Sequence, residues 1–230
     1  MHSPGKSITL RAIMTGFIPR TGSILYYAMD MYNNDQVAGN MDRHYYYVDN
    51  PQQKIRYIIL SRFAEGDSQT IVKNGYEAEQ LAWLTNVALN VDAGCSIIVF
   101  THFLSTDTIP DPYGVANALD SYSGNGEIIA VIEGHTHWDY HGYTAGGIPV
   151  IATTCDKNTP WVDPSGQDTE PIYLGDRTSG TIKEQAFDVY IINKVAKTLT
   201  QVRIGCPIRD GKDPEVWTEY EEVTTSYDRS

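Results

Sequence analysis

The sequence lacks several features that would place it in a broad class of protein. It has no apolar run near the roughly 20 residues that cross a membrane, and its amino terminus has no signal-peptide core. Basic residues are few, because 17 Lys and Arg stand against 29 Asp and Glu, which gives a net charge of -12. Binding to a nucleic-acid backbone needs clustered Lys and Arg, so we do not expect it. We expect a soluble protein of the cytoplasm, or part of a particle assembled there.

Cysteine is also scarce. The three cysteines, Cys95, Cys155 and Cys206, are scattered and show no zinc-type spacing. An odd number of distant thiols favours buried, reduced cysteines over a disulfide framework. Phenylalanine is rare too, with 5 residues against 16 tyrosines. Because tyrosine joins an apolar ring to a polar tip, this surplus is typical of wet interfaces and half-exposed sheets.

The remaining composition, 230 residues with 41% hydrophobic and 20% charged, is that of an ordinary globular domain. Short β-branched runs predict strands. The expected strands are 45–49, 55–60, 96–100, 128–132, 148–152, 186–192 and 198–204. A helix capped by Asn74 is expected between the second and third of these, with Leu81, Leu84, Ala88 and Val91 on one face. Residues 104–124 are expected to form a long loop. Alternating strands and helix predict an α/β (α+β) fold.

Two of the expected strands end in histidine. His102 follows the run 96–100, and the run 128–132 leads into Glu133-Gly134-His135-Thr136-His137. Glycine lets the backbone turn tightly there, and we expect the three imidazoles to converge on one edge of the sheet. Imidazole is the commonest neutral metal ligand, so the pattern predicts a metal site of His102, His135 and His137. The alternative is that each histidine is hydrogen-bonded within a loop.

At these residues the sequence resembles the calcineurin-like metallophosphoesterases. The late motifs of that family are a strand ending in histidine and then strand–Gly-His-x-His, which here read 97–102 and 131–137. The resemblance covers residues 40–205 and implies a portion of a metallophosphoesterase-like β-sandwich flanked by helices. It also implies a divalent metal of the Mn, Zn or Fe class and a phosphoester substrate. By resemblance, His102 and His135 serve one metal and His137 the other.

We expect the early motifs of the family to be missing from the amino-terminal part of the chain. These motifs, Asp-x-His, Gly-Asp-x-x-Asp and Gly-Asn-His-Asp/Glu, supply the carboxylates and the asparagine of a two-metal centre. Gly39-Asn40 is followed by Met41-Asp42 rather than histidine. Met1-His2-Ser3 stands where a remnant of the last motif would lie, which would put His2 in the place of the family's catalytic histidine. Three neutral imidazoles can hold one zinc-like ion, but they do not form an anionic cage for two metals.

We therefore expect the chain to correspond to the carboxyl half of such an enzyme, weak or inactive alone. We divide it into a variable segment 1–43, a core 44–205 and an acidic tail 206–230 outside the core. The first functional reading is metal-dependent hydrolysis of a phosphate mono- or diester when an upstream half completes the site. The alternative is a non-catalytic structural or interaction component of a larger assembly, such as a phage or virus particle, with no metal bound. A half-fold leaves sheet edges to be covered, so either reading predicts a protein partner or a homo-oligomer.

Overall fold

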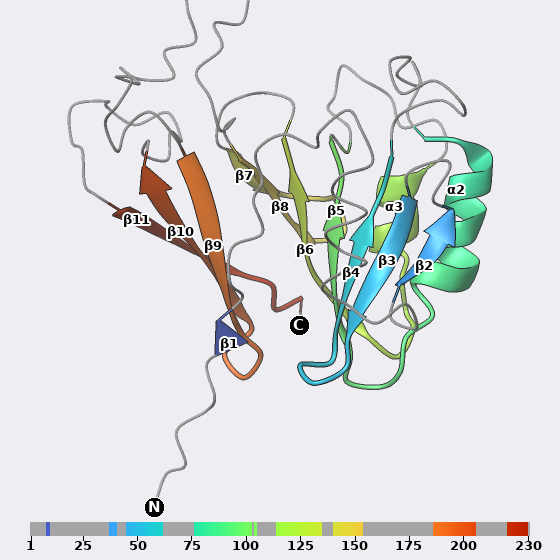
Figure 1. Ribbon diagram of the computed structural model, residues 1–230, viewed down its shortest axis with the longest axis horizontal. Coiled ribbons are helices and arrows are strands. Elements are labelled where there is room, and N and C mark those ends of the chain that lie inside the picture. The colour runs from blue at the N-terminus through green and yellow to red at the C-terminus, as the bar shows by residue number, and fades with distance from the viewer. Residues whose placement is uncertain are drawn as a thin grey trace, which may run out of the picture.

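The protein forms two β-sheets that face each other, as the computed structural model in Figure 1 shows. The structure describes residues 8–9, 37–40, 45–61, 76–102, 104, 114–134, 140–153, 186–205 and 220–229. The larger sheet has seven strands in the order β2-β3-β4-β5-β6-β8-β7. The smaller sheet has four strands in the order β1-β9-β10-β11. The smaller sheet therefore combines strands from both ends of the chain.

Parallel pairing occupies the centre of the larger sheet. Its strands are β2 (Val37–Asn40), β3 (Tyr45–Asn50), β4 (Ile55–Ile59), β5 (Ser96–Phe100), β6 (Glu127–Glu133), β7 (Tyr140–Tyr143) and β8 (Pro149–Ala152). Strands β4, β5, β6 and β8 run parallel, whereas β2, β3 and β7 are antiparallel to their neighbours. Parallel strands are covered on both faces, which explains the unbroken apolar runs of β5 and β6. Their carboxyl ends consequently lie along one edge of the sheet.

A bulge in β6 decides which face its last residues join. The register of β5 against β6 shifts by one residue between Ile97 and Ile98. Beyond the shift, Val131 packs in the core on the helix side and Ile132 packs in the core between the sheets. Because side chains alternate along a strand, Glu133 then falls on the helix side. Without the bulge, this carboxylate would point between the two sheets.

The smaller sheet is antiparallel throughout. Its strands are β1 (Ile8–Thr9), β9 (Ala186–Asn193), β10 (Thr198–Gly205) and β11 (Tyr220–Ser226). Residues of β10 alternate between half-buried and buried over its whole length, as expected for a strand with one covered face. Leu199, Gln201 and Arg203 lie on the covered face and are all buried. That face is the one turned toward the larger sheet.

Helices cover the opposite face of the larger sheet (Figure 1). Helix α2 (Ala78–Trp83) continues into the π-helical turn η2 (Leu84–Ala88), and α3 (Val115–Asp120) follows β5. The larger sheet thus has a core on each face. The helix-side core contains Ile58, Leu60, Tyr76, Leu84, Ala88, Ile97, Val99, Leu104, Leu119, Ile128 and Val131, among others. The inter-sheet core contains Ile55, Tyr57, Ile98, Ile129, Ala130, Ile132, Ile151, Tyr190, Ile192, Leu199 and Tyr227.

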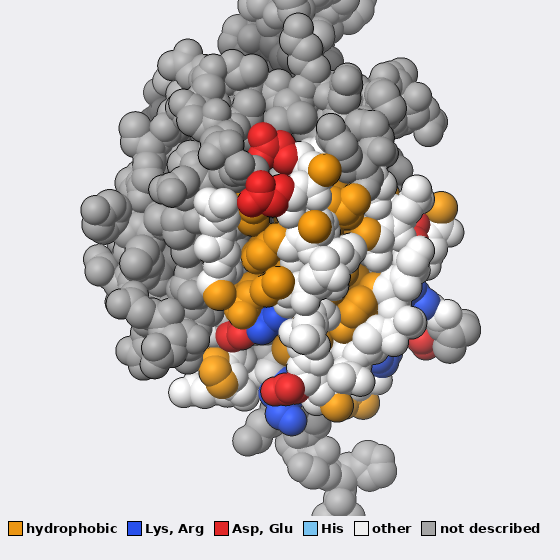
Figure 2. Space-filling view, turned by 90° about the vertical axis from the view of Figure 1, so that its right-hand side faces the viewer, with side chains coloured by type: hydrophobic (Ala, Val, Ile, Leu, Met, Phe, Trp, Pro, Cys, Tyr) orange, Lys and Arg blue, Asp and Glu red, His pale blue; other side chains and the backbone are white. Residues whose placement is uncertain are grey.

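An aromatic cluster fixes α2 over the edge of the larger sheet. The ring of Trp83 lies 4.8 Å from that of Tyr45 and 6.3 Å from that of Tyr47, measured between centroids. Such tilted and stacked pairs are favourable beyond the apolar area they bury. Figure 2 shows this side of the molecule, where apolar side chains run down the middle and acidic side chains gather at the upper end. The tyrosine surplus is therefore used in part to join helix and sheet.

The predicted α/β class is confirmed, together with the packed sheets and the helices on one of them. Each strand expected from the sequence is present, with bounds that differ by a residue or two. The expected helical face is confirmed at Leu84 and Ala88, which are fully buried, and Leu81 is half-buried. Val91 is buried too, but it lies beyond the last helical residue, Ala88. The helix begins at Ala78 with Glu77 in the N-cap position, while the predicted cap, Asn74, lies outside the described residues. No helix in the described ranges is long and apolar enough to cross a bilayer.

Two predictions about loops and tails were wrong. The interval 104–124, expected to be a loop, contains α3 (Val115–Asp120). The acidic segment expected to lie outside the core contributes strand β11 and the side chain of Tyr227, which is 1% exposed. The amino-terminal segment also contributes to both sheets, through β1 and β2. The ends of the chain are therefore part of the fold.

Candidate metal centre

The carboxyl ends of the parallel strands form a continuous edge. Backbone hydrogen bonds continue past the last strand residues: Leu60 N–H donates to Phe100 O, Thr101 to Ile132, Gly134 to His102 and Thr153 to Glu133, at 2.8–3.2 Å. We call the row Leu60, Thr101, His102, Gly134 and Thr153 the strand-end edge. Ligand sites of sheets with parallel strands commonly lie outside such an edge. The strand-end edge is therefore the place where the predicted ligands would meet.

His102 is the predicted site residue that the structure places at this edge. It follows β5 directly and is half-buried. Its carbonyl oxygen accepts a hydrogen bond of 3.2 Å from the N–H of Gly134, the residue that precedes His135. The chain that leads to His135 and His137 therefore leaves the sheet beside His102. His135, His137 and the predicted catalytic residue His2 lie outside the described residues.

Buried side chains support the strand-end edge from the helix side. The side chain of Gln80 in α2 makes two hydrogen bonds to the backbone of Ser61, one from Nε2 to the carbonyl at 2.7 Å and one from the Ser61 N–H at 2.8 Å. The hydroxyls of Tyr76 and Thr101 lie 2.6 Å apart, and both residues are buried. These contacts tie the ends of β4 and β5 to the helical layer. Because Thr101 directly precedes His102, these contacts also restrain the backbone at His102.

Glu133 provides a third contact of this kind, at the end of β6. Its carboxylate Oε2 accepts a hydrogen bond of 2.8 Å from the N–H of Leu104, and both residues are buried. The Glu133 carbonyl accepts from Thr153 N–H, which connects β6 to the end of β8. Glu133 therefore joins the segment after His102 to two neighbouring strands.

His102 is half-buried, so its imidazole is not sealed within a core. Imidazole suits zinc and iron, whereas manganese favours carboxylate and water oxygens. Among the residues that the structure describes, no group of three His, Cys, Asp or Glu side chains comes together. Two of the three predicted ligands lie outside that set, so the complete ligand set remains a prediction.

The prediction that Asp-x-His is missing was wrong, because this tripeptide occurs in the sequence at Asp42-Arg43-His44 and Asp139-Tyr140-His141. Only His141 of these acids and imidazoles lies in a described range, on the edge strand β7. Its Nε2 lies 2.5 Å from Oε1 of Gln201 on β10. The ring of His141 therefore contributes to the contact between the two sheets.

Comparisons with known proteins add little beyond this geometry. No protein family model matches the sequence, and no curated protein matches it. Among solved structures, the chain is similar to a dimetal phosphatase from Danio rerio, with a TM-score of 0.46 and 14% sequence identity. The match covers 82% of this chain and 62% of the phosphatase, so the chain spans about three fifths of that protein's length. A likeness of this size is a distant one and carries no argument about activity.

Sequence reasoning placed His102 correctly after a buried strand but missed the residues that support it. Tyr76, Gln80 and Glu133 were not assigned a role. One signal was present for Glu133, a carboxylate that directly follows an apolar run and stands two residues before a predicted ligand. Buried acids need partners, so such a position predicts a specific hydrogen bond. The partner itself, a backbone N–H of another loop, depends on the tertiary fold.

Proposed function

We propose that this chain supplies the histidine-bearing part of a metal-dependent phosphoesterase, which hydrolyses a phosphate mono- or diester once carboxylates from an upstream half complete its site. The hydrogen bond between Gly134 N–H and the His102 carbonyl supports the proposal most directly, because it puts Gly134, the first residue of Gly-His-x-His, beside the strand-end histidine. The order of these motifs in the sequence supports the same reading.

The proposed chemistry follows from charge. A bound divalent ion would polarise the phosphoryl oxygens and lower the pKa of an attacking water. His102, His135 and His137 would present neutral imidazoles to that ion. The chain carries a net charge of -12, which repels a phosphoester unless a cation neutralises the site locally. Imidazoles add no negative charge that would hold a second cation, so upstream carboxylates are needed for full activity.

Metal content and hydrolysis test the proposal together. We expect chelator-free protein to take up Mn²⁺ or Zn²⁺ at about one ion per chain, measured by elemental analysis. Hydrolysis of bis(p-nitrophenyl) phosphate with added Mn²⁺ should be weak or absent for the chain alone. His102→Ala and His135→Ala should each reduce metal uptake at least about 10-fold, because each removes one of three ligands.

His141→Ala is the matched control, since it removes an imidazole that bonds to Gln201 instead. We expect it to keep the metal content of the wild type once circular dichroism shows that it is folded. Substantial turnover by the isolated chain would contradict the need for an upstream half. Protein that binds no metal and hydrolyses nothing would contradict the proposal and favour a non-catalytic component of a larger assembly.

A further inference from the structure

A tight bend between α3 and β6 leaves little room around Gly126. The bend occupies residues 121–126. A Cβ atom added at Gly126 would lie 2.4 Å from Cγ2 of Val91 and 2.9 Å from the carbonyl oxygen of Cys95. Both distances are too short for a side chain, so only glycine fits here without displacing its neighbours. The residue before it, Asn125, is exposed.

The bend therefore places an exposed asparagine directly before a glycine. Such a pair deamidates more readily than other asparagine pairs, because glycine has no side chain to shield its backbone nitrogen. The Gly126 nitrogen loses its proton to a solvent base and attacks Cγ of Asn125. The bond from Cγ to the side-chain nitrogen then breaks, and ammonia leaves with a proton from the solvent. Water opens the resulting succinimide at either carbonyl, which yields aspartate or isoaspartate.

The nitrogen that has to attack is held by Tyr122. Gly126 N–H donates a hydrogen bond of 3.0 Å to the Tyr122 hydroxyl. The Tyr122 ring fills the inside of the bend, because a Cβ atom at Gly124 would lie 2.5–2.7 Å from three of its atoms. The ring also packs against the helix-side core. An amide that donates this hydrogen bond is harder to deprotonate, and it is released only when the bend opens locally.

We propose that Asn125 is a site of deamidation and isoaspartate formation, and that the Tyr122 hydroxyl restrains the reaction in the folded protein. The reaction proceeds when local opening releases the Gly126 N–H. Isoaspartate adds one methylene group to the main chain just before Glu127, whose N–H donates to the Cys95 carbonyl at 3.0 Å. The modified protein is therefore less stable, because the longer chain disturbs this first contact of β6 with the residue before β5.

Mass spectrometry of protein kept in mildly alkaline buffer follows the reaction at Asn125. The folded wild type should react at least about 10-fold more slowly than the same chain in urea, because the attack requires local opening. Tyr122→Phe keeps the ring and removes the acceptor, so it should speed the reaction of the folded protein about 2- to 10-fold, the effect of one lost hydrogen bond. In urea the two proteins should react equally fast.

Tyr143→Phe is the matched control, because it removes an exposed hydroxyl that donates to the Ser226 carbonyl. It should leave the rate at Asn125 unchanged. The other Asn-Gly pair of the sequence, Asn74-Gly75, calibrates the rate of the urea-unfolded chain. Aged wild type should lose more stability in urea unfolding than aged Asn125→Gln, whose longer side chain closes the corresponding ring far more slowly.

Three outcomes would overturn this inference, and none of them depends on metal binding. The first is an Asn125 that does not deamidate even in urea. The second is an equal rate in the folded and the urea-unfolded wild type. The third is a folded Tyr122→Phe that reacts no faster than the wild type. If Tyr122→Phe does not fold, hydrogen exchange of the Gly126 amide in the wild type decides, since exchange as fast as in the unfolded chain would exclude the restraint.

Discussion

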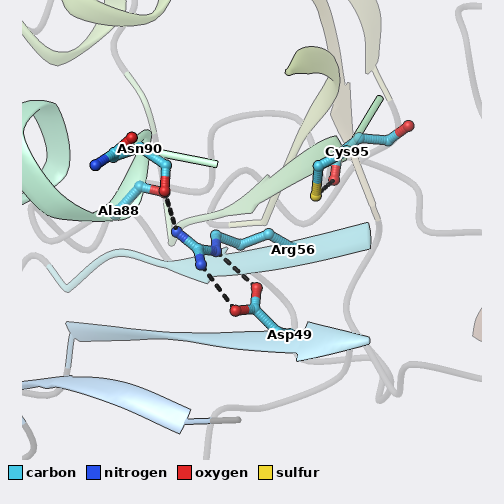
Figure 3. Close-up of polar contacts among 6 residues, drawn as sticks. Asp49, Arg56, Ala88, Asn90 and Cys95 are labelled. Atoms are coloured by element: carbon cyan, nitrogen blue, oxygen red, sulfur yellow. Dashed lines mark hydrogen bonds and ion pairs between the residues drawn. The ribbon is translucent and has the colours of Figure 1, made fainter. Parts of the chain in front are cut away.

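Arg56 shows how much of the helix-side layer depends on one side chain. Its guanidinium makes two hydrogen bonds of 2.7 Å to the carboxylate of Asp49 and donates to the carbonyls of Ala88 and Asn90 at 3.0 Å (Figure 3). It also lies 3.7 Å from the ring centroid of Tyr47. Burial alone would lower the pKa of Arg56, but the bonds to Asp49 outweigh it and leave that pKa raised. One residue of β4 thus joins the β3–β4 hairpin to the carboxyl end of η2.

Removing this guanidinium should be costly. Arg56→Met leaves the Asp49 carboxylate and a buried carbonyl without their donor, so we expect a loss of about 2–3 kcal/mol in the free energy of unfolding. Arg56→Lys keeps the charge, but an ammonium group cannot make the same set of hydrogen bonds as the planar guanidinium. It should therefore recover only part of the lost stability. The free energy of unfolding of each variant is measured by urea unfolding. Arg229→Met, which removes an exposed guanidinium, is the control. Equal stability of Arg56→Met and the control would contradict this account.

Residue types alone predicted part of the candidate site. A histidine after an apolar strand was sufficient to place His102 at the end of β5, because the strand itself is encoded locally. The contact between Glu133 and Leu104 was not predictable, because it depends on a one-residue register shift between β5 and β6. Cys95 was expected to be a buried thiol and is half-buried, with burial as the main cause of its raised pKa.

At the scale of elements, prediction succeeded where the local pattern matched the final environment. Strands β4, β5 and β6 are apolar on both faces because a core lies on each side, and their runs are unmistakable. Strand β11 was missed because its charges were taken for a solvated tail. It nevertheless alternates, with Val223 half-buried and Thr225 and Tyr227 buried between exposed Glu222, Thr224 and Ser226. The many charged residues of this segment concealed the alternation of buried and exposed side chains that marks a strand.

Strand β7 was missed for a different reason. Its sequence, Tyr140–Tyr143, contains no apolar alternation, and its pairing with β8 supplies the strand geometry. One side chain of β7 then crosses to the other sheet: His141 Nε2 donates to Oε1 of the fully buried Gln201. The remaining polar atoms of the pair, His141 Nδ1 and Gln201 Nε2, have no hydrogen-bond partner within the described structure. The pair therefore depends on a single hydrogen bond.

A double-mutant cycle should reveal this dependence. His141→Leu or Gln201→Met alone leaves the other polar group buried without its partner, so each should cost about 1–3 kcal/mol in urea unfolding. The double variant should cost less than the sum by about 1 kcal/mol or more, since both polar groups are then gone.

The control cycle uses Thr200 and Thr224, whose hydroxyls lie 2.8 Å apart on the exposed side of β10 and β11. Water replaces that contact freely, so the Thr→Val cycle should show a coupling energy near zero. A coupling energy for His141 and Gln201 no larger than that of the control would show that the cross-sheet bond contributes nothing.

At the scale of the molecule, the sheets are also joined at the end opposite the strand-end edge. The turn between β9 and β10 carries Lys194, which donates to the carbonyls of Gln53 and Lys54 in the β3–β4 turn at 2.9 and 3.1 Å. Lys197 in the same turn bonds to Glu127 at the start of β6. Burial lowers the pKa of Lys194. Side chains therefore join the two sheets at this end of the molecule as well as through the pair His141 and Gln201.

Tyr227 adds to the contacts at this end of the two sheets and makes them sensitive to alkaline pH. Its hydroxyl donates to the carbonyl of Asn193 at 3.2 Å, and the residue is 1% exposed. Burial, with a smaller effect of Glu127, raises the pKa of Tyr227 from 10.0 to about 12. Between these two values the unfolded chain has lost the proton and the folded chain retains it. The folded state then binds more protons, so its stability is complete below pH 10 and falls as the pH rises toward 12.

Urea unfolding of the wild type and Tyr227→Phe from pH 8 to pH 11.5 tests the contribution of Tyr227 to stability. At pH 8 the variant should be less stable by about 1 kcal/mol, because the hydrogen bond to Asn193 is lost. Above pH 10 only the wild type must keep the phenol of residue 227 neutral, so its advantage should shrink, by at most about 1.4 kcal/mol per pH unit. The raised pKa of Tyr46 is common to both proteins and cancels. The lowered pKa of Lys194 has the opposite sign, since its unfavourable contribution disappears as the pH rises, but it is common to both proteins and cancels. Parallel stability curves across this range would show that Tyr227 ionises as freely in the folded protein as in the unfolded chain. The hydroxyl of Tyr227 would then be in contact with water in the folded state.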